Sequence, residues 1–284
     1  MLFRSEGLGK LRALISKIAD VSIREFSLVC LSSLARKLSH NRKGEFKRVR
    51  VKDPLEEVDV DILTEFKNVC DSYAAAIIQN PLPKHHEYQL YRHDMRAETN
   101  FEAKFNIVIT SPPYGDSMTT VAYGQYSSFG IEWLRGLNPF GDADLSLDRK
   151  CLGGILRHDI DIIKAKSAQP IVSLIAKYNR KRALHVLSFI FDLQLSIEQL
   201  CKSLKRGAIV CFVVGNRTVS NIMIPLDTIS RELFEAEGLD YIETRVRTIS
   251  MKRMPSRNSP TNVSGITSDT MSQEMIVILK KKDL

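Results

Sequence analysis

Residues 105–115 read FNIVIT and then SPPYG, and this stretch decides the fold. The first six residues form a compact run rich in β-branched side chains, which predicts a buried strand over 105–110. A similar run, AIVCFVV, covers residues 208–214 and ends at Gly215 and Asn216. Between the two runs, apolar residues recur with helical periodicity. The sequence therefore predicts an α/β protein built around a sheet.

Further strands and helices complete this α/β part. We expect additional strands over residues 87–93, 240–250 and 273–281, of which the last two pair antiparallel. The spacing of apolar residues predicts helix over 168–205 with a break near 179–182, and Pro225 predicts the start of another helix. The 22 residues between the last two strands, 251–272, are long for a hairpin loop, which indicates a role beyond turning.

The first 80 residues show helical periodicity and no strand pattern. The predicted helices cover residues 9–19, 21–40 and 58–79. Ser22 and Glu25 have the spacing of a capping box, so we expect Ser22 to cap the second helix. The predicted organisation is a helical segment over 1–84 and an α/β part over 85–284, with long loops at 137–167 and 251–272.

The composition is that of an ordinary globular protein, with 44% hydrophobic and 26% charged residues. No apolar run reaches the roughly 18 residues of a membrane span, and the N-terminus lacks the apolar region of a signal peptide. The five cysteines are scattered and form no Cys-x-x-Cys pair, which argues against a disulfide framework or a metal site. These features favour a cytoplasmic protein with no membrane partner and no bound metal.

Basic residues gather toward the two ends of the chain, whose net charge is +8. Such segments suit a polyanion such as nucleic acid, although on charge alone a solvated surface is the simpler explanation. One basic stretch runs from Arg42 to Lys52. In the loop 251–272, the side chains that suit phosphates and base edges are Lys252, Arg253, Arg257 and Asn258. The alternative for both segments is a flexible solvated loop.

The loop after the first predicted strand has unusual chemistry. Pro112 and Pro113 lack backbone donors and fix the backbone, so the loop is stiff and presents carbonyl oxygens. Tyr114 adds an aromatic face on which a planar ring can stack. Ligands of open α/β sheets bind at the carboxyl ends of strands, which is where this loop lies. A rim of acceptors beside a stacking ring suits the amine of a nucleobase.

The SPPY sequence after an apolar strand resembles motif IV of the S-adenosylmethionine-dependent amino-methyltransferases. The serine in first place, Ser111, is typical of the cytosine-N4 DNA methyltransferases, whereas adenine-N6 enzymes more often have Asp or Asn there. Residues 115–126 (GDSMTTVAYGQY) and 257–262 (RNSPTN) are also similar to bacterial cytosine-N4 modification methylases. The resemblance covers roughly residues 87–284, and it implies a partial Rossmann-like methyltransferase sheet behind the helical segment.

The resemblance also implies roles for individual residues. The Ser111 hydroxyl and the Pro112 carbonyl would hold the target amine, and Tyr114 would stack on a base flipped out of double-stranded DNA. The expected catalytic motif, named Ser111–Tyr114 below, consists of Ser111, Pro112, Pro113 and Tyr114. Asp94 and Thr110 would contact the cofactor S-adenosylmethionine, although Asp94 also fits a turn or cap. We expect Asp116 to be a surface turn residue, and Gly215 to lie either at the family's motif VI or in a tight turn.

One family feature is missing. The Phe-x-Gly-x-Gly loop that cradles the methionine part of the cofactor does not occur in the 284 residues. We therefore expect the chain to be a catalytic and target-binding half, with a second polypeptide supplying the glycine-rich loop. It could be one subunit of a split enzyme, the 3′ part of an interrupted gene or a truncated relative. The leading hypothesis is a cytosine-N4 DNA methyltransferase of a restriction–modification system. The alternatives are an adenine-N6 DNA or guanine-amine RNA methyltransferase, and a non-catalytic nucleic-acid-binding remnant.

Overall fold

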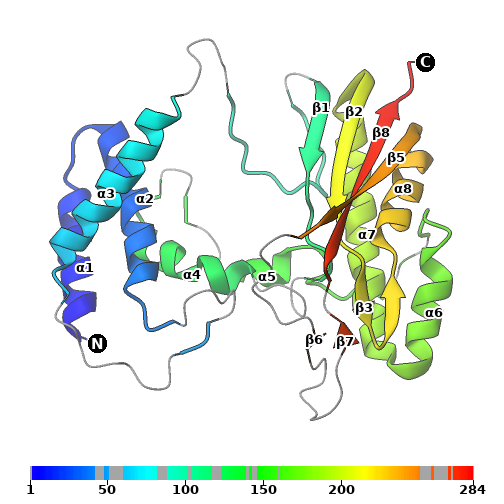
Figure 1. The fold of residues 1–284 in the computed structure, drawn as a ribbon, viewed down its shortest axis with the longest axis horizontal. Coiled ribbons are helices and arrows are strands. Elements are labelled where there is room, and N and C mark those ends of the chain that lie inside the picture. The colour runs from blue at the N-terminus through cyan, green and yellow to red at the C-terminus, as the bar shows by residue number, and fades with distance from the viewer. Residues whose placement is uncertain are drawn as a thin grey trace. The chain divides into compact units, whose positions relative to one another are not determined.

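The computed structural model groups the chain into two compact units, one helical and one α/β (Figure 1). The helical unit contains Met1–Arg92 and Ala122–Asp148, and the α/β unit contains His93–Val121 and Arg149–Leu284. Residues 122–148 thus group with the helical unit, whereas the sequence-based division places them in the α/β part. The structure describes residues 2–41, 48–50, 60–81, 88–101, 104–116, 123–138, 141–142, 146–158, 160, 162–249, 257–258, 268–269 and 271–283.

The helical unit is built around α2. Its helices are α1 (Leu2–Ile15), α2 (Val21–Lys37), α3 (Ile62–Gln79) and α4 (Tyr123–Leu134), while α5 (Leu147–Lys150) crosses the boundary between the units. The apolar stripe of α2 is fully buried at Cys30, Leu31 and Leu34, and it forms the centre of this core. The three helices predicted in the first 80 residues are confirmed.

The predicted cap of α2 is wrong. Asp20, not Ser22, precedes the helix, and its Oδ1 accepts a hydrogen bond of 2.9 Å from the backbone N–H of Ile23. Aspartate and serine are comparable N-caps, and Asp20 is the one that lies directly before the first helical residue, where its side chain reaches the free backbone N–H groups. Ser22 is therefore the second residue of the helix.

The α/β unit contains a four-stranded mixed sheet (Figure 1). The strands β1 (Phe105–Thr110) and β2 (Leu204–Val214) are parallel, and β8 (Gln273–Lys281) pairs antiparallel with β2 and with β5 (Leu239–Thr248). The order β1-β2-β8-β5 inserts the last strand of the chain between two earlier ones. The predicted α/β class, these four strands and the antiparallel pairing of the last two are confirmed.

The strand predicted over 87–93 is wrong within the described residues 88–93, which form no ladder. Its apolar side chains Tyr88, Leu90 and Tyr91 are exposed. Alternation of apolar and polar residues stabilises a strand only where one face is buried, and this segment has no such face. The chain instead turns at Asp94, whose carbonyl accepts a bond of 2.9 Å from the Ala97 N–H.

Helices cover one face of the sheet. The helices α7 (Arg180–Lys202) and α8 (Leu226–Ala236) lie against the strands in Figure 1, and α6 (Ala168–Tyr178) packs against α7. Alternate residues of β2, Ala208, Val210, Phe212 and Val214, are buried in the shared core. Asn179 ends α6 and caps α7 by accepting a bond of 3.0 Å from the backbone N–H of Arg182, which is the predicted break near 179–182.

The other face of the sheet is apolar but less covered. Ile107 and Ile109 of β1 are 61% and 76% exposed, although parallel strands are usually buried on both faces. In the described part of the chain, β1 pairs with β2 along one edge and no strand pairs with its other edge. The strand that carries the motif Ser111–Tyr114 therefore has an open edge and an exposed apolar side.

The remaining strands are short hairpins. β3 (Arg217–Val219) pairs with β4 (Ile222–Ile224) through a tight turn in which Ser220 and Asn221 have positive φ. β6 (Arg257–Asn258) pairs with β7 (Ser268–Asp269) inside the loop 251–272. Among the described helices, none has the length and apolar character needed to cross a membrane.

Candidate active site

The motif Ser111–Tyr114 leaves β1 at its carboxyl end, as the sequence predicted for a ligand site. The Ser111 Oγ lies 3.1 Å from the Tyr114 hydroxyl oxygen, so the loop folds back and brings the two predicted functional side chains together. Ser111 is exposed, whereas Pro112, Pro113 and Tyr114 are half-buried. An exposed serine side chain and a half-buried tyrosine thus lie together on a rigid loop.

Tyr114 is tied to the far strands of the same sheet. Its hydroxyl donates a hydrogen bond of 2.7 Å to Glu274 Oε1 at the start of β8. Glu274 Oε2 accepts two bonds from the guanidinium of Arg247, its cross-strand neighbour on β5, one of them 3.1 Å from Nε. The hydrogen bond from Arg247, followed by that from Tyr114, lowers the pKa of the Glu274 carboxyl, so this group is ionised at neutral pH.

Burial is the largest cause that raises the pKa of the Tyr114 phenol, and the contact with Glu274 raises it further. The tyrosine hydroxyl therefore keeps its proton at neutral pH. Neither Glu274 nor Arg247 was among the sequence-predicted site residues. A single acid at the start of an apolar strand carries no signal that would connect it with a motif 160 residues earlier.

Gly215 closes the back of the site, directly after β2. A Cβ at this position would overlap Met271 Sδ and would stand 2.9 Å from Tyr114 Cδ2. Only glycine lets the β2 end lie this close to the tyrosine ring. The structure therefore gives Gly215 a packing role against the motif Ser111–Tyr114, and its place at the family's motif VI stays a prediction.

Asp116 is not a surface turn residue, which corrects the expectation from sequence. Its side chain is 0% exposed and lies 3.4 Å from the guanidinium of Arg217, at the start of β3. Burial lowers the pKa of Arg217, and the charge of Asp116 opposes that change. A buried carboxylate needs such a partner, so the pair fastens the loop after β1 to the loop after β2.

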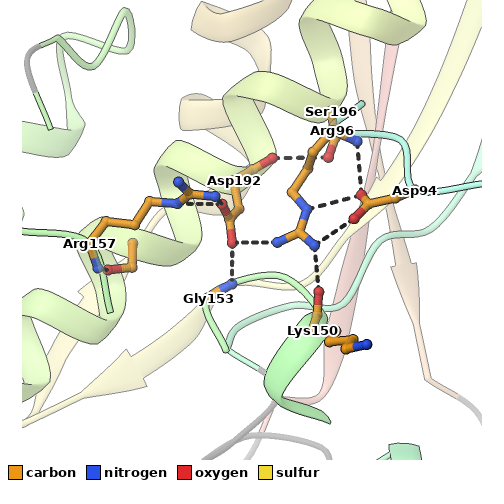
Figure 2. A network of polar contacts seen from close by, with 8 residues as sticks. Asp94, Arg96, Lys150, Gly153, Arg157, Asp192 and Ser196 are labelled. Carbon is orange, nitrogen blue, oxygen red and sulfur yellow. Dashed lines mark hydrogen bonds and ion pairs between the residues drawn. The ribbon is translucent and has the colours of Figure 1, made fainter. Parts of the chain in front are cut away.

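Asp94 belongs to a polar network that holds three segments of the α/β unit together (Figure 2). Both its carboxylate oxygens accept bonds from the side chain of Arg96, at 3.0 and 2.6 Å. Arg96 also contacts the carbonyl of Lys150 and lies 3.0 Å from Asp192 Oδ2. The contact with Arg96 is the main cause that lowers the pKa of Asp94.

Asp192 of α7 is the centre of this network (Figure 2). Its carboxylate is fully buried, and besides Arg96 it accepts bonds of 2.9 Å from the Gly153 N–H and from Arg157 Nε. Gly153 packs closely against Asp116, because an added Cβ would stand 2.9 Å from that of Asp116. The network thus supports the residues behind the motif Ser111–Tyr114.

The described residues do not form a complete site for S-adenosylmethionine. Asp94 is bound by Arg96 through both oxygens, and the half-buried Thr110 pairs with Phe212 as the last residue of β1. The sequence has no glycine-rich loop of the expected pattern. A cofactor role for Asp94 and Thr110 stays a prediction. Among the described residues, no group of three or more His, Cys, Asp or Glu side chains could hold a metal ion.

The expected DNA-binding residues are described only in part. Lys252 and Arg253 lie outside the described residues, while the backbones of Arg257 and Asn258 pair with Asp269 and Ser268. Of the basic stretch 42–52, only 48–50 is described, and there Arg48 forms an ion pair of 2.9 Å with Glu132 in the helical unit. Contact with DNA therefore stays a prediction for both segments.

Comparison with known proteins gives one relative of clear similarity. The chain is similar to a type II methyltransferase. The relative is M.MvaI of Kocuria varians, with 32% identity over 288 residues, which cover 94% of this chain. The match covers 62% of the length of M.MvaI, so the chain spans less than two thirds of that protein. No family model matches the chain.

One solved structure also matches, a protein of Thermus thermophilus named as a DNA modification methylase. Its identity to this chain is 15%, and the match covers 39% of this chain and 50% of the other. The TM-score of 0.26 is too low to support an argument about the fold or the site.

The Asp192 network predicts a large effect on stability. Asp192→Asn removes the charge between Arg96 and Arg157 and should lower the free energy of unfolding of the α/β unit by about 3–5 kcal/mol. Hydrogen exchange of the β2 amides measures this quantity. The control Asp283→Asn, which removes an exposed ion pair with Lys280, should leave it unchanged. Equal stability of the two variants would contradict a structural role for Asp192.

Proposed function

We propose that this chain is the catalytic and target-binding part of an S-adenosylmethionine-dependent DNA methyltransferase, acting on the exocyclic N4 amine of cytosine in a restriction–modification system. The observation that carries the proposal is the pairing of the Ser111 and Tyr114 side chains at the carboxyl end of β1. The similarity to a type II methyltransferase over most of the chain supports the same reaction class.

The chemistry follows from the properties of an aromatic amine. Its lone pair is delocalised into the ring, so the nitrogen is a poor nucleophile. Acceptors that bind its two hydrogens favour a tetrahedral nitrogen and make the lone pair available. In this proposal the Ser111 Oγ and the Pro112 carbonyl are those acceptors, Pro113 stiffens the loop, and Tyr114 stacks on the flipped base. The methyl group would come from S-adenosylmethionine.

Ser111→Ala and Tyr114→Ala should each nearly abolish methyl transfer while the fold is retained. The first removes an amine acceptor, and the second removes a stacking face worth about 1–3 kcal/mol per base. Methylation of DNA by the reconstituted enzyme measures the effect, with circular dichroism as the check on folding. Tyr178→Ala, an exposed tyrosine on α6, is the matched control and should keep the wild-type rate.

Product analysis of the methylated DNA, with an RNA substrate assayed in parallel, decides the target. N4-methylcytosine supports the proposal, whereas N6-methyladenine or a methylated guanine in RNA would support an alternative substrate. A wild-type rate in either the Ser111 or the Tyr114 variant would make the assignment of the motif wrong.

The open edge of β1 supports a second polypeptide in the active enzyme. A parallel strand with two exposed isoleucines, Ile107 and Ile109, is an unfavourable surface in water and suits a further strand with its covering helices. We propose that the polypeptide docked there supplies the glycine-rich loop for the cofactor. A polypeptide strand parallel to β1 would place its carboxyl end beside Ser111.

The chain alone should bind S-adenosylmethionine weakly and should not methylate DNA, because it lacks that loop. Calorimetry with the cofactor, on the chain alone and with the protein encoded beside it, measures the difference. Binding and activity should appear only in the mixture. Robust methylation by the purified single chain would contradict this proposal and reveal a different cofactor site.

The loop 251–272 is the proposed DNA-facing segment. Lys252→Ala with Arg253→Ala should weaken DNA binding and lower the slope of log affinity against log salt by about 2, because each lost phosphate contact accounts for about 1. Titrations at several salt concentrations measure the slope. Lys205→Ala with Arg206→Ala, an exposed basic pair at the opposite end of β2, is the control. An unchanged slope in the first variant would move the DNA surface elsewhere.

A further inference from the structure

Four polar side chains from three parts of the α/β unit (β5, β8 and the loop after β1) form one continuous chain of hydrogen bonds. Arg247 on β5 donates to Glu274 on β8, Tyr114 donates to Glu274 over 2.7 Å, and the Ser111 Oγ lies 3.1 Å from the tyrosine hydroxyl. The first two of these residues lie outside the motif that the sequence singled out. Glu274 contacts the motif at the hydroxyl of Tyr114, and Arg247 reaches it through Glu274.

The direction of each bond follows from counting protons. An ionised carboxylate only accepts, and an arginine only donates. A tyrosine hydroxyl has one proton, which is already given to Glu274, so the tyrosine oxygen can act only as an acceptor toward Ser111. The Ser111 hydroxyl must therefore donate its own proton to Tyr114. The lone pairs of the Ser111 Oγ then remain for another partner.

We propose that Glu274, held by Arg247, is a positioning residue that fixes the direction of the Ser111 hydroxyl proton through Tyr114. Its effect is that the Ser111 Oγ offers lone pairs, and not a proton, to the amine of the target base. The inference rests on the proposed function, because it explains how a serine, which both donates and accepts, acts as an acceptor at this site.

The opposite arrangement shows why the charge of Glu274 matters. A neutral amide at position 274 can donate as well as accept, so it can turn the tyrosine proton toward Ser111. The serine proton would then point toward the amine hydrogens, and two donors would face each other. Glu274→Gln keeps the size of the side chain, removes its negative charge and adds a hydrogen-bond donor.

The kinetic test uses the reconstituted enzyme and three variants. Glu274→Gln and Tyr114→Phe should each lower kcat by about tenfold, the size expected for one hydrogen bond, with KM for DNA unchanged because the stacking ring remains. Adding Glu274→Gln to Tyr114→Phe should have no further effect on kcat, since both changes break the same relay. The control Glu243→Gln removes a similar ion pair with Arg245 on β5, away from the motif, and should leave kcat unchanged.

A second measurement does not depend on methylation. Because the Glu274 carboxylate helps to raise the pKa of the Tyr114 phenol, Glu274→Gln should lower that pKa. An ultraviolet titration of the chain, with the Tyr114→Phe chain subtracted, isolates this phenol. An unchanged phenol pKa would overturn the relay, whatever the activity.

The two readouts separate failure of the inference from failure of the proposed function. A wild-type enzyme that methylates, together with a Glu274→Gln variant of wild-type kcat or an additive double variant, overturns the inference alone. Absence of methylation in the wild-type reconstituted enzyme overturns the proposed function and the role toward a target amine with it. The phenol titration still decides whether the hydrogen-bond relay exists.

Discussion

The parallel pairing of β1 with β2 is the constraint on which the rest of the site depends. The register places Thr110 opposite Phe212, so both strands end at the same edge of the sheet. The loop after β1 carries the motif Ser111–Tyr114 and Asp116, while the loop after β2 begins at Gly215 and leads to Arg217, the first residue of β3. Because the two loops start side by side, the tyrosine ring packs on Gly215 and the buried Asp116 meets Arg217. A shift in this register would separate both contacts at once.

The antiparallel direction of β8 explains how a residue near the C-terminus reaches the motif. β8 starts where β2 ends, with Met275 opposite Val214, so Glu274 lies at the edge of the sheet that carries the site. β5 runs opposite to β8 and ends at that same edge, which places Arg247 beside Glu274. The mixed sheet therefore brings the ends of β1, β2 and β5 and the start of β8 to one place. Tyr114 lies among them and depends on all of them for its orientation.

The sequence was informative where a local pattern determines the structure. The β-branched runs at 105–110 and 208–214 form strands because their apolar side chains face a core of helices, and Asn179 separates two helices because its side chain caps the second. The strand predicted from alternating apolar and polar residues at 88–93 did not form, because neither face of this segment is buried. Ser22 failed as a cap because Asp20 was already available to the same helix end.

Long-range contacts explain the rest of what the sequence did not predict. The motif could be found because its four residues, SPPY, are consecutive in the sequence. Its partners Glu274 and Arg247 lie in segments with no recognisable sequence pattern. The burial of Asp116 depends on Arg217, which lies 101 residues later and reaches it only after β1 and β2 have paired. Ion pairs of this kind form only in the assembled sheet. Neither the residue types nor their spacing in a single sequence predicts which residues will pair.

The open side of β1 connects the stability of the α/β unit with its chemistry. Burial of an isoleucine side chain contributes about 1.5–3 kcal/mol, so covering Ile107 and Ile109 would favour association at this strand. The same strand leads directly into Ser111, and an added parallel strand would end at the edge of the sheet where the motif lies. The surface that makes the isolated unit unfavourable in water is thus the one where a partner polypeptide would present a methyl donor to the target. In the proposed enzyme, completing the sheet and completing the active site are one event.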